Sequence, residues 1–323
     1  MHSSVLIPSR RPLRPLARLA LGAAVLGVAV PAQAQDRRDN NCARTAIAAR
    51  EASRLEIQAD LLNAIGVCLN QPSFFEAIQC SLEAFEEYQE ALHELPEQYQ
   101  ARLDLCEALG SGPYAPHIDP DEFSSSVDNP FFPLVVGTTL VYEGETEDGL
   151  ERVECKTLDE TREIMGVECA VVQAREFVDG EMVEDTLDYY AQDLWGNVWY
   201  FGELSFELED GFIVNMDGSW IAGEDGAKPG IIMLASADPG RVYRQEWYLN
   251  EAEDIGTFIA EGQSVEVPFN GGTTFEGCWQ IQDTTPIEPD ELEYKYFAMG
   301  VGLVKALDVE SGEEIELVDI LVE

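Results

Sequence analysis

Four cysteines in the first third of the chain have a spacing that strongly constrains the fold. The distance in sequence from Cys42 to Cys68 equals the distance from Cys80 to Cys106. Equal spacing on two consecutive segments is the register of two antiparallel helices. We therefore expect nested disulfides, Cys42–Cys106 and Cys68–Cys80, at the two ends of a helical hairpin spanning residues 35–110. Other pairings are open, and a thiolate metal site between the helices is the alternative.

The residues between these cysteines favour helices. Residues 43–69 are rich in alanine and leucine, with apolar side chains recurring at intervals of three and four. Pro72 then interrupts the pattern, and Ser73 with Glu76 forms a capping-box signature for a second helix. Gly110 is the expected end of that helix.

Residues 1–34 have the features of a secretory signal. Four arginines precede a short apolar run, residues 19–30, and Ala32-Gln33-Ala34 is a small-x-small cleavage site. The run is too short to cross a bilayer, and no later run approaches about 20 residues, so we expect no transmembrane segment. The expected location is periplasmic or extracellular, where cysteines oxidise.

The chain is strongly acidic, with a formal net charge of −43. Removal of the signal with its four arginines leaves 15 basic side chains against 62 acidic ones. A field of this sign repels nucleic acid and anionic lipid and attracts divalent cations. Nucleic acid is therefore excluded as a partner, and calcium is a candidate ion.

The periodicity changes after residue 128. Residues 111–128 are rich in Pro, Ser and Asp and are expected to form a linker. Residues 129–323 contain short β-rich runs separated by Asp-Gly, Gly-Asn and Asn-Gly turns, without intervening helical patterns. The expected fold is mainly β with an N-terminal helical hairpin, and its antiparallel sheet forms an open barrel or a sandwich.

Three cysteines lie in the expected β domain. Cys169 and Cys278 have similar sequence contexts, so a disulfide between them is favoured. The alternative is a Cys155–Cys169 bond between neighbouring strands. The sequence leaves the pairing of Cys155 undecided.

Histidine-based catalysis has little support. His93 and His117 are the histidines that remain after signal cleavage, and neither has a metal-ligand or nucleophile pattern around it. Glycoside hydrolysis requires just two carboxylates, and Glu203 and Glu246 are candidates because they lie beside aromatic residues. In a chain with 62 acids such a pair is a weak signal.

Aromatic residues indicate a ligand site. They are dense over residues 189–201, and aromatic rings stack on sugars or line lipid pockets, although they also form cores. The ligand candidates are Tyr190, Trp199, Trp220 and Lys228. For a metal, Asp119, Asp121 and Glu122 form a weak acidic candidate without EF-hand spacing.

Several motifs of the β region resemble a known group of proteins. They include DNPFFPL at residues 128–134, YAQD followed by GNVWY and GE at 190–203, and AKPGIIM at 227–233. Residues 118–308 resemble an uncharacterised family of secreted β-rich bacterial proteins. The resemblance implies no activity. It leaves out the hairpin, which favours a boundary near residue 120.

These observations favour a non-catalytic function. We expect an exported binding or envelope-associated protein that holds an apolar or carbohydrate ligand, such as a lipid or glycan, on its β domain. A secreted carboxylate-based hydrolase and a calcium-stabilised structural or adhesive protein are the alternatives.

Overall fold

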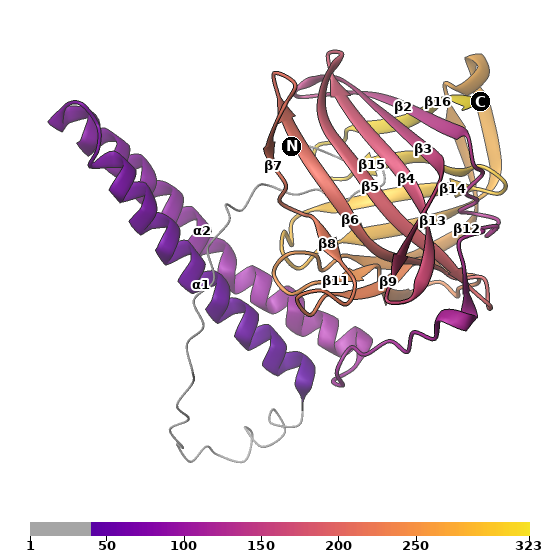
Figure 1. Ribbon diagram of the computed structural model, residues 1–323, viewed down its shortest axis with the longest axis horizontal. Helices are drawn as coiled ribbons and strands as arrows, with labels where there is room; N and C mark the ends of the chain where they lie inside the picture. The colour runs from indigo at the N-terminus through magenta and orange to yellow at the C-terminus, as the bar shows by residue number, and fades with distance from the viewer. Residues whose placement is uncertain (1–39) are drawn as a thin grey trace. The chain divides into compact units, whose positions relative to one another are not determined.

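The computed structural model describes residues 40–323. The expected signal at residues 1–34 lies outside the described residues. The described chain divides into two compact units, one ending at Tyr114 and one spanning Ala115–Glu323. The first contains the helices and the second contains the sheet, so the fold is mainly β with two N-terminal helices, as predicted (Figure 1).

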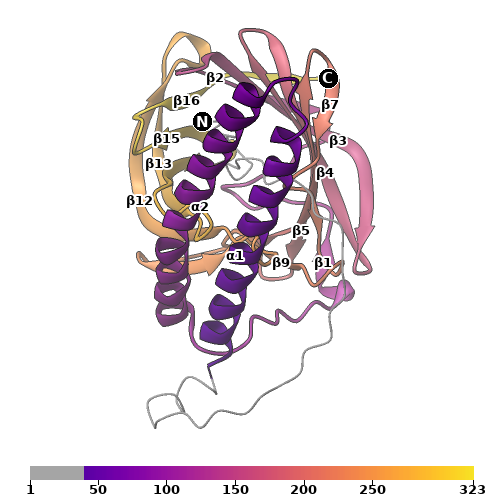
Figure 2. The same cartoon turned by 90° about the vertical axis from the view of Figure 1, so that its left-hand side faces the viewer.

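The helical unit is an antiparallel hairpin of α1 (Asn41–Cys68) and α2 (Phe74–Leu109), which run side by side in both views (Figures 1 and 2). Side chains cap both helices. Asn40 accepts a hydrogen bond from the Ala43 N–H at 2.8 Å. Ser73 and Glu76 form the predicted capping box at the start of α2.

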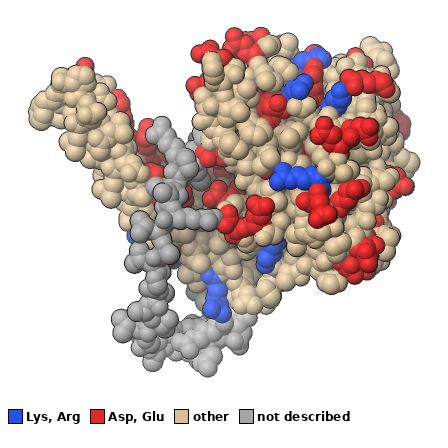
Figure 3. Space-filling model, viewed as in Figure 1, with Lys and Arg blue, Asp and Glu red and all other residues tan. Residues whose placement is uncertain are grey.

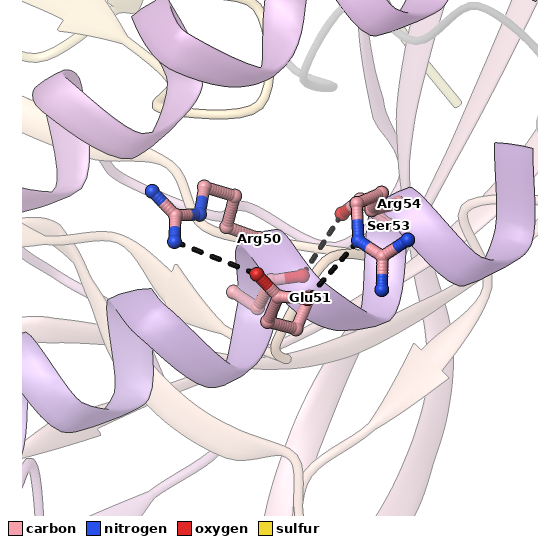
Figure 4. A network of polar contacts seen from close by, with 5 residues as sticks. Arg50, Glu51, Ser53 and Arg54 are labelled. Carbon is pink, nitrogen blue, oxygen red and sulfur yellow. Dashed lines mark hydrogen bonds and ion pairs between the residues drawn. The ribbon is translucent and has the colours of Figure 1, made fainter.

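Two disulfides join the ends of the hairpin, Cys42–Cys106 and Cys68–Cys80, with Cα–Cα distances of 5.6 and 5.4 Å. Both are the pairings predicted from the cysteine spacing. Near the Cys42–Cys106 end, Glu51 forms ion pairs with Arg50 at 3.5 Å and Arg54 at 3.0 Å (Figure 4).

The sheet unit begins with the short helix η2 (Pro120–Glu122) and contains one more, η3 (Phe269–Gly271). Its strands are antiparallel to their neighbours. In chain order they are β1 (Phe123–Ser124), β2 (Thr138–Thr146), β3 (Gly149–Ile164), β4 (Val167–Val178), β5 (Glu181–Asp193), β6 (Val198–Glu209), β7 (Phe212–Asn215), β8 (Trp220–Ile221), β9 (Lys228–Met233), β10 (Arg241–Arg244), β11 (Glu246–Trp247), β12 (Ile255–Val267), β13 (Thr273–Thr284), β14 (Leu292–Ala298), β15 (Gly302–Asp308) and β16 (Glu314–Val322).

These strands form one 16-stranded sheet that is nearly closed into a barrel (Figure 1). The main path begins at β10, passes through β12 to β16, continues through β2 to β6 and ends with β9 and β11. Its two ends are consecutive in the chain, because Gln245 joins β10 to β11. The segment 241–247 therefore pairs with β12 on one side and with β9 on the other.

The prediction of a Cys169–Cys278 disulfide is wrong. Cys155, Cys169 and Cys278 are all free and buried. Cys169 lies on β4 and Cys278 on β13, and the strands β14, β15, β16, β2 and β3 separate these two in the sheet. Similar local sequence therefore did not indicate spatial proximity.

Acidic side chains are spread over the visible face of the sheet unit, with few lysines and arginines among them (Figure 3). This distribution agrees with the net charge of −43. Within residues 40–323, neither helix is apolar enough over a sufficient length to cross a membrane.

Candidate functional site

Three cross-strand pairs place polar and aromatic side chains on the same face of β5 and β6. Residues directly opposite each other in an antiparallel pair point to the same side of the sheet. The pairs are Thr186 with Ser205, Asp188 with Glu203, and Tyr190 with Tyr200. All six residues are buried, so this face belongs to the interior of the sheet unit.

A β-bulge makes this arrangement possible. In a regular strand, Tyr200 and Glu203 would point to opposite faces, because they are an odd number of residues apart. The register between β5 and β6 shifts where Tyr189 pairs with Gly202 and Tyr190 pairs with Tyr200, which leaves Phe201 as the extra residue. Gly202 has a φ of 135°, a conformation that favours glycine. The bulge thus turns Tyr200 and Glu203 to the same side.

A short hydrogen bond joins Asp188 and Tyr200 within this group. The Tyr200 hydroxyl donates to Oδ1 of Asp188 at 2.6 Å. Burial raises the pKa of Asp188 to about 8, while the Tyr200 hydrogen bond opposes this shift and Glu184 and Glu246 add to it. A neutral carboxyl group can therefore exist in this interior near neutral pH.

The structure brings Glu203 and Glu246 into the same electrostatic neighbourhood. Both side chains are wholly buried. Burial raises the pKa of Tyr190 and Tyr200 well above the usual value, and Asp188, Glu203 and Glu246 all add to both shifts. Three carboxyl groups therefore act on the same pair of rings.

Close backbone contact at β9 brings Glu246 towards β6. Gly230 of β9 pairs with Tyr200, and the neighbouring Pro229 pairs with Glu246 of β11. A Cβ atom on Gly230 would overlap the backbone of Gln245, so this position requires glycine. The missing side chain allows β11 to approach.

Trp220 completes the group of aromatic rings. It lies on β8 directly opposite Glu203 and is buried. Its ring meets the Tyr200 ring edge-on, with centroids 5.4 Å apart, and Tyr200 stacks on Tyr190 at 4.9 Å. We call the group formed by Asp188, Tyr190, Tyr200, Glu203, Trp220 and Glu246 the interior site.

Three polar atoms of the interior site have no hydrogen-bond partner among the described residues. They are Oδ2 of Asp188, the hydroxyl of Tyr190 and Nε1 of Trp220, and each is buried. Buried polar atoms in folded proteins almost always have a partner in the protein or in ordered water. These atoms are one acceptor, one hydroxyl that can donate or accept, and one donor.

The other two predicted ligand residues have different contacts. Trp199 donates from Nε1 to Asp193 at 2.8 Å, an aspartate that also accepts from the Asn197 N–H at 2.9 Å. The Lys228 ammonium lies 4.6 Å from the centroid of the Trp247 ring. Of the four predicted ligand residues, Tyr190 and Trp220 lie in the interior site.

The candidate calcium ligands lie at the start of the sheet unit. Asp119 caps η2 by accepting from the Asp121 N–H at 3.2 Å, and Glu122 ends this short helix. In the part of the chain that the structure describes, no group of three or more His, Cys, Asp or Glu side chains is arranged to hold a metal ion. A calcium-binding role for these acids stays a prediction.

Sequence reasoning missed Asp188 and a second buried acid, Glu151. Burial raises the pKa of Glu151 to about 9, and Glu176 adds to the shift. A signal for Asp188 exists in the sequence, since Thr186, Asp188 and Tyr190 alternate along β5. A carboxylate among side chains that all point to the interior of a sheet is unusual, and it therefore marks a candidate functional site.

Comparisons with known proteins give no functional information. No model of a known protein family matches the chain, and no curated protein matches its sequence. A crystal structure described as a "putative lipoprotein" from Parabacteroides distasonis is similar over 59% of this chain and 98% of that chain, with 15% identity and a TM-score of 0.32. An uncharacterised family fits these findings.

Proposed function

We propose that this chain is an exported, non-catalytic binding protein that holds a small organic molecule in the interior site. The observation that carries the proposal is the set of buried polar atoms of Asp188, Tyr190 and Trp220 that lack partners among the described residues. Leaving such an atom without a partner costs about 1–3 kcal/mol. A bound molecule that bonds to these atoms offsets this cost.

Features outside the site support export. The two disulfides of the hairpin are typical of proteins from oxidising compartments. The sequence of residues 1–34 is that of a secretory signal. A periplasmic or extracellular location follows from this proposal.

The chemistry of the interior site narrows the ligand. A fully apolar lipid tail would leave Asp188 and Tyr190 without hydrogen bonds, which is unfavourable in a buried site. The Tyr190, Tyr200 and Trp220 rings offer apolar surface for a compact molecule. The ligand is therefore expected to combine polar groups with at least one apolar face.

Entry to the interior site requires movement, because its carboxylates are wholly buried. A segment with few pairings to separate is β8, which pairs with β6 through Ile221 with Gly202 and Trp220 with Glu203. Separation of β8 from β6 would expose Glu203 and Trp220 together. The Ala222 N–H donates to the Phe201 carbonyl of β6 at 2.8 Å, and hydrogen exchange at Ala222 that slows when ligand is present would support this route.

Native mass spectrometry of the mature protein from an oxidising host tests the proposal. We expect extra mass that is lost on denaturation, and we expect Trp220→Phe to lower its occupancy by removing the Nε1 donor. Trp195→Phe is the matched control, since Trp195 is 67% exposed. A bare protein, together with a crystal structure that shows just water at the three atoms, would reject the proposal.

One observation favours a second candidate, a carboxylate-based hydrolase. Asp188 has a raised pKa of about 8 and lies directly opposite Glu203. Paired carboxyl groups in different environments can act as acid and base in glycoside hydrolysis. This candidate requires activity on polysaccharides that Glu203→Gln and Glu246→Gln each reduce at least tenfold. Unchanged activity in both variants would eliminate it.

A further inference from the structure

We infer that the end of the helical hairpin inserts into one leaflet of a lipid bilayer with zwitterionic head groups. We call residues 61–82, which comprise the end of α1, the turn and the start of α2, the hairpin tip. The inference goes beyond the proposed function and is independent of it, because it concerns the helical unit and not the interior site.

The hairpin tip carries almost no charge. Glu76 is the one Asp, Glu, Lys, Arg or His between Asp60 and Glu83 in the sequence. Its carboxylate accepts a hydrogen bond from the Ser73 N–H at 3.1 Å, as part of the capping box of α2. Charged residues make up 25% of the whole chain, so the tip differs from the acidic surface elsewhere (Figure 3). A segment without charged side chains leaves water at a much lower cost.

Large apolar side chains of the hairpin tip are exposed. Phe74 is 82% exposed and Leu62 is 71% exposed. The other exposed apolar residues of the tip are Val67, Leu69, Phe75, Ile78 and Leu82. The hairpin does not use them for its own packing, since the buried residues nearby are Cys68 and Ala84, which are small. A contiguous apolar surface of this kind is typical of contact with a membrane or with another protein.

The direction of these side chains distinguishes a membrane from a protein partner. Successive residues of an α-helix are about 100° apart around the axis, so Leu62 points about 120° away from the buried Cys68. On α2, Leu82 points about 160° away from the buried Ala84 by the same measure. Both helices thus present apolar side chains away from each other, on different sides of the hairpin. A partner docked on one side would leave the other side exposed, whereas lipid surrounds both.

The length of the hairpin tip matches one leaflet. Residues 61–68 of α1 and 74–82 of α2 each extend over about 12–14 Å, at about 1.5 Å per residue. The hydrocarbon core of a bilayer is about 30 Å thick, so the tip reaches roughly half of it. The hairpin tip is therefore suited to enter a bilayer from one side.

The turn of the hairpin tip pairs its backbone groups internally. The Gln71 N–H donates to the Cys68 carbonyl at 3.1 Å, and the Glu76 N–H donates to the Ser73 hydroxyl at 3.2 Å. Lipid offers backbone groups no hydrogen bonds, so internal partners of this kind are required there. The Cys68–Cys80 disulfide joins the helices next to the turn. Both helices would therefore enter the bilayer as one unit.

The charge beside the hairpin tip indicates the kind of lipid. Directly after the tip, α2 continues with four glutamates, Glu83, Glu86, Glu87 and Glu90. When the tip is inserted, these carboxylates lie near the head groups, where anionic lipids repel them. We therefore expect zwitterionic lipids to be preferred.

Vesicle flotation tests the inference. The mature protein with its disulfides intact is mixed with phosphatidylcholine vesicles, or with vesicles in which phosphatidylglycerol replaces part of the phosphatidylcholine. We expect the protein to float with the phosphatidylcholine vesicles. The anionic lipid should reduce the bound fraction at low salt.

Variants of the hairpin tip locate the binding. Phe74→Ser combined with Phe75→Ser should weaken vesicle binding about tenfold or more, because two aromatic rings lose their contact with lipid. Phe212→Ser is the matched control, since Phe212 of β7 is 74% exposed and Phe75 is 75% exposed. It should bind vesicles like the wild type. All three side chains are exposed, so we expect these variants to fold, and circular dichroism checks this.

Single variants test the two sides of the hairpin tip separately. Leu62→Ser and Leu82→Ser should each weaken vesicle binding, because an inserted tip contacts lipid on both sides. A loss in just one of them would mean that the hairpin lies on the membrane surface with one side in contact, which overturns insertion.

The remaining outcomes also decide the inference. Protein that does not float with phosphatidylcholine vesicles overturns it. Vesicle binding that Phe74→Ser with Phe75→Ser leaves unchanged overturns it as well, because the contact with lipid is then elsewhere. If the protein does not float and sedimentation shows a dimer that the same double variant dissociates, a second copy of the chain covers the tip instead. None of these results affects the proposal for the interior site.

Discussion

The Tyr200 hydroxyl donates a 2.6 Å hydrogen bond to Asp188 on the neighbouring strand, and both side chains are wholly buried. This contact places a carboxyl group and its donor inside a sheet whose interior is otherwise mostly apolar. The oxygen of Asp188 that Tyr200 does not reach has no partner among the described residues, and it is the acceptor that the proposed ligand would use. The pair therefore links the stability of the sheet unit to the proposed binding of a ligand.

The first prediction concerns Asp188→Asn and pH. The pKa of Asp188 is raised from 3.8 to about 8 in the folded protein, mainly by burial. The folded state therefore holds this proton more tightly than the unfolded state. Its stabilising contribution is complete below pH 3.8 and is lost as the pH rises through about 8. Asp188→Asn should flatten the fall in Tm over this window.

A shift of one pKa unit corresponds to about 1.4 kcal/mol in the free energy of unfolding, which is roughly 3–6 °C in Tm for a domain of this size. We take this as a conservative magnitude for the effect of Asp188→Asn. Calorimetric melts between pH 4 and pH 9 provide the measurement. Asp185→Asn is the control, because Asp185 is on the same strand and forms an ion pair with Arg175 at 3.8 Å. If Asp188→Asn keeps the wild-type slope, other buried acids such as Glu151 account for it.

The second prediction concerns the three free cysteines. Burial raises the pKa of Cys169 to about 12 and that of Cys278 to about 11, so little thiolate forms at neutral pH. Iodoacetamide should leave the native protein unmodified and should add three groups after denaturation without reductant, at Cys155, Cys169 and Cys278. Mass spectrometry counts the added groups. A single added group would mean that a third disulfide forms after all.

The third prediction concerns the hairpin. The Cys68–Cys80 bond closes a sequence separation of 12 residues and the Cys42–Cys106 bond one of 64. Loop-closure entropy assigns them about 3 and about 4 kcal/mol, respectively. Replacing either pair with serine should lower the melting temperature of the helical circular dichroism signal. The melt of the sheet unit should not change, because its cysteines are free; a parallel loss in the sheet unit would contradict this.

The sequence was sufficient to predict the hairpin and its two disulfides. Equal spacing from Cys42 to Cys68 and from Cys80 to Cys106 allows one simple register of two antiparallel helices. Ser73 with Glu76 marks the start of the second helix. Such local signals depend on few residues. The Cys169–Cys278 prediction failed because it used local context for a contact between strands that are distant in the sheet.

The sheet was predicted as antiparallel, but its near closure was not visible. Turn dipeptides and alternation identify strands, whereas closure depends on residues 241–247 pairing with β12 on one side and β9 on the other. These partners are set by the whole topology. The sequence consequently left the choice between an open barrel and a sandwich undecided.

A binding or catalytic role for the residues of the interior site stays a prediction. Glu203, Glu246, Tyr190 and Trp220 were named from their neighbours in the sequence, and the structure places all four around Tyr200. The sequence did not show that Glu203 and Tyr200 share a face, because strict alternation places them on opposite faces of the strand. The bulge between β5 and β6 brings them to the same face. One inserted residue therefore changes which side chains share a face.

The last prediction tests this bulge through Gly202→Ala. Gly202 has a φ of 135°, and a Cβ atom at this position would overlap the carbonyl oxygen of Trp220. The substitution should push β8 away from β6 and separate Trp220 from Glu203. We expect a loss of about 1–3 kcal/mol in the free energy of unfolding from the overlap, with a further cost from the strained backbone.

Gly211→Ala is the control for backbone strain alone, because Gly211 has a φ of 76° and a Cβ atom added there would meet no other atom within 4 Å. It should cost about 1 kcal/mol and leave hydrogen exchange at Ala222, whose N–H donates to Phe201, unchanged. Gly202→Ala should accelerate that exchange and abolish ligand binding. Equal effects from the two variants would mean that close contact at Gly202 does not hold β8, and that the interior site depends on other residues to keep Trp220 in place.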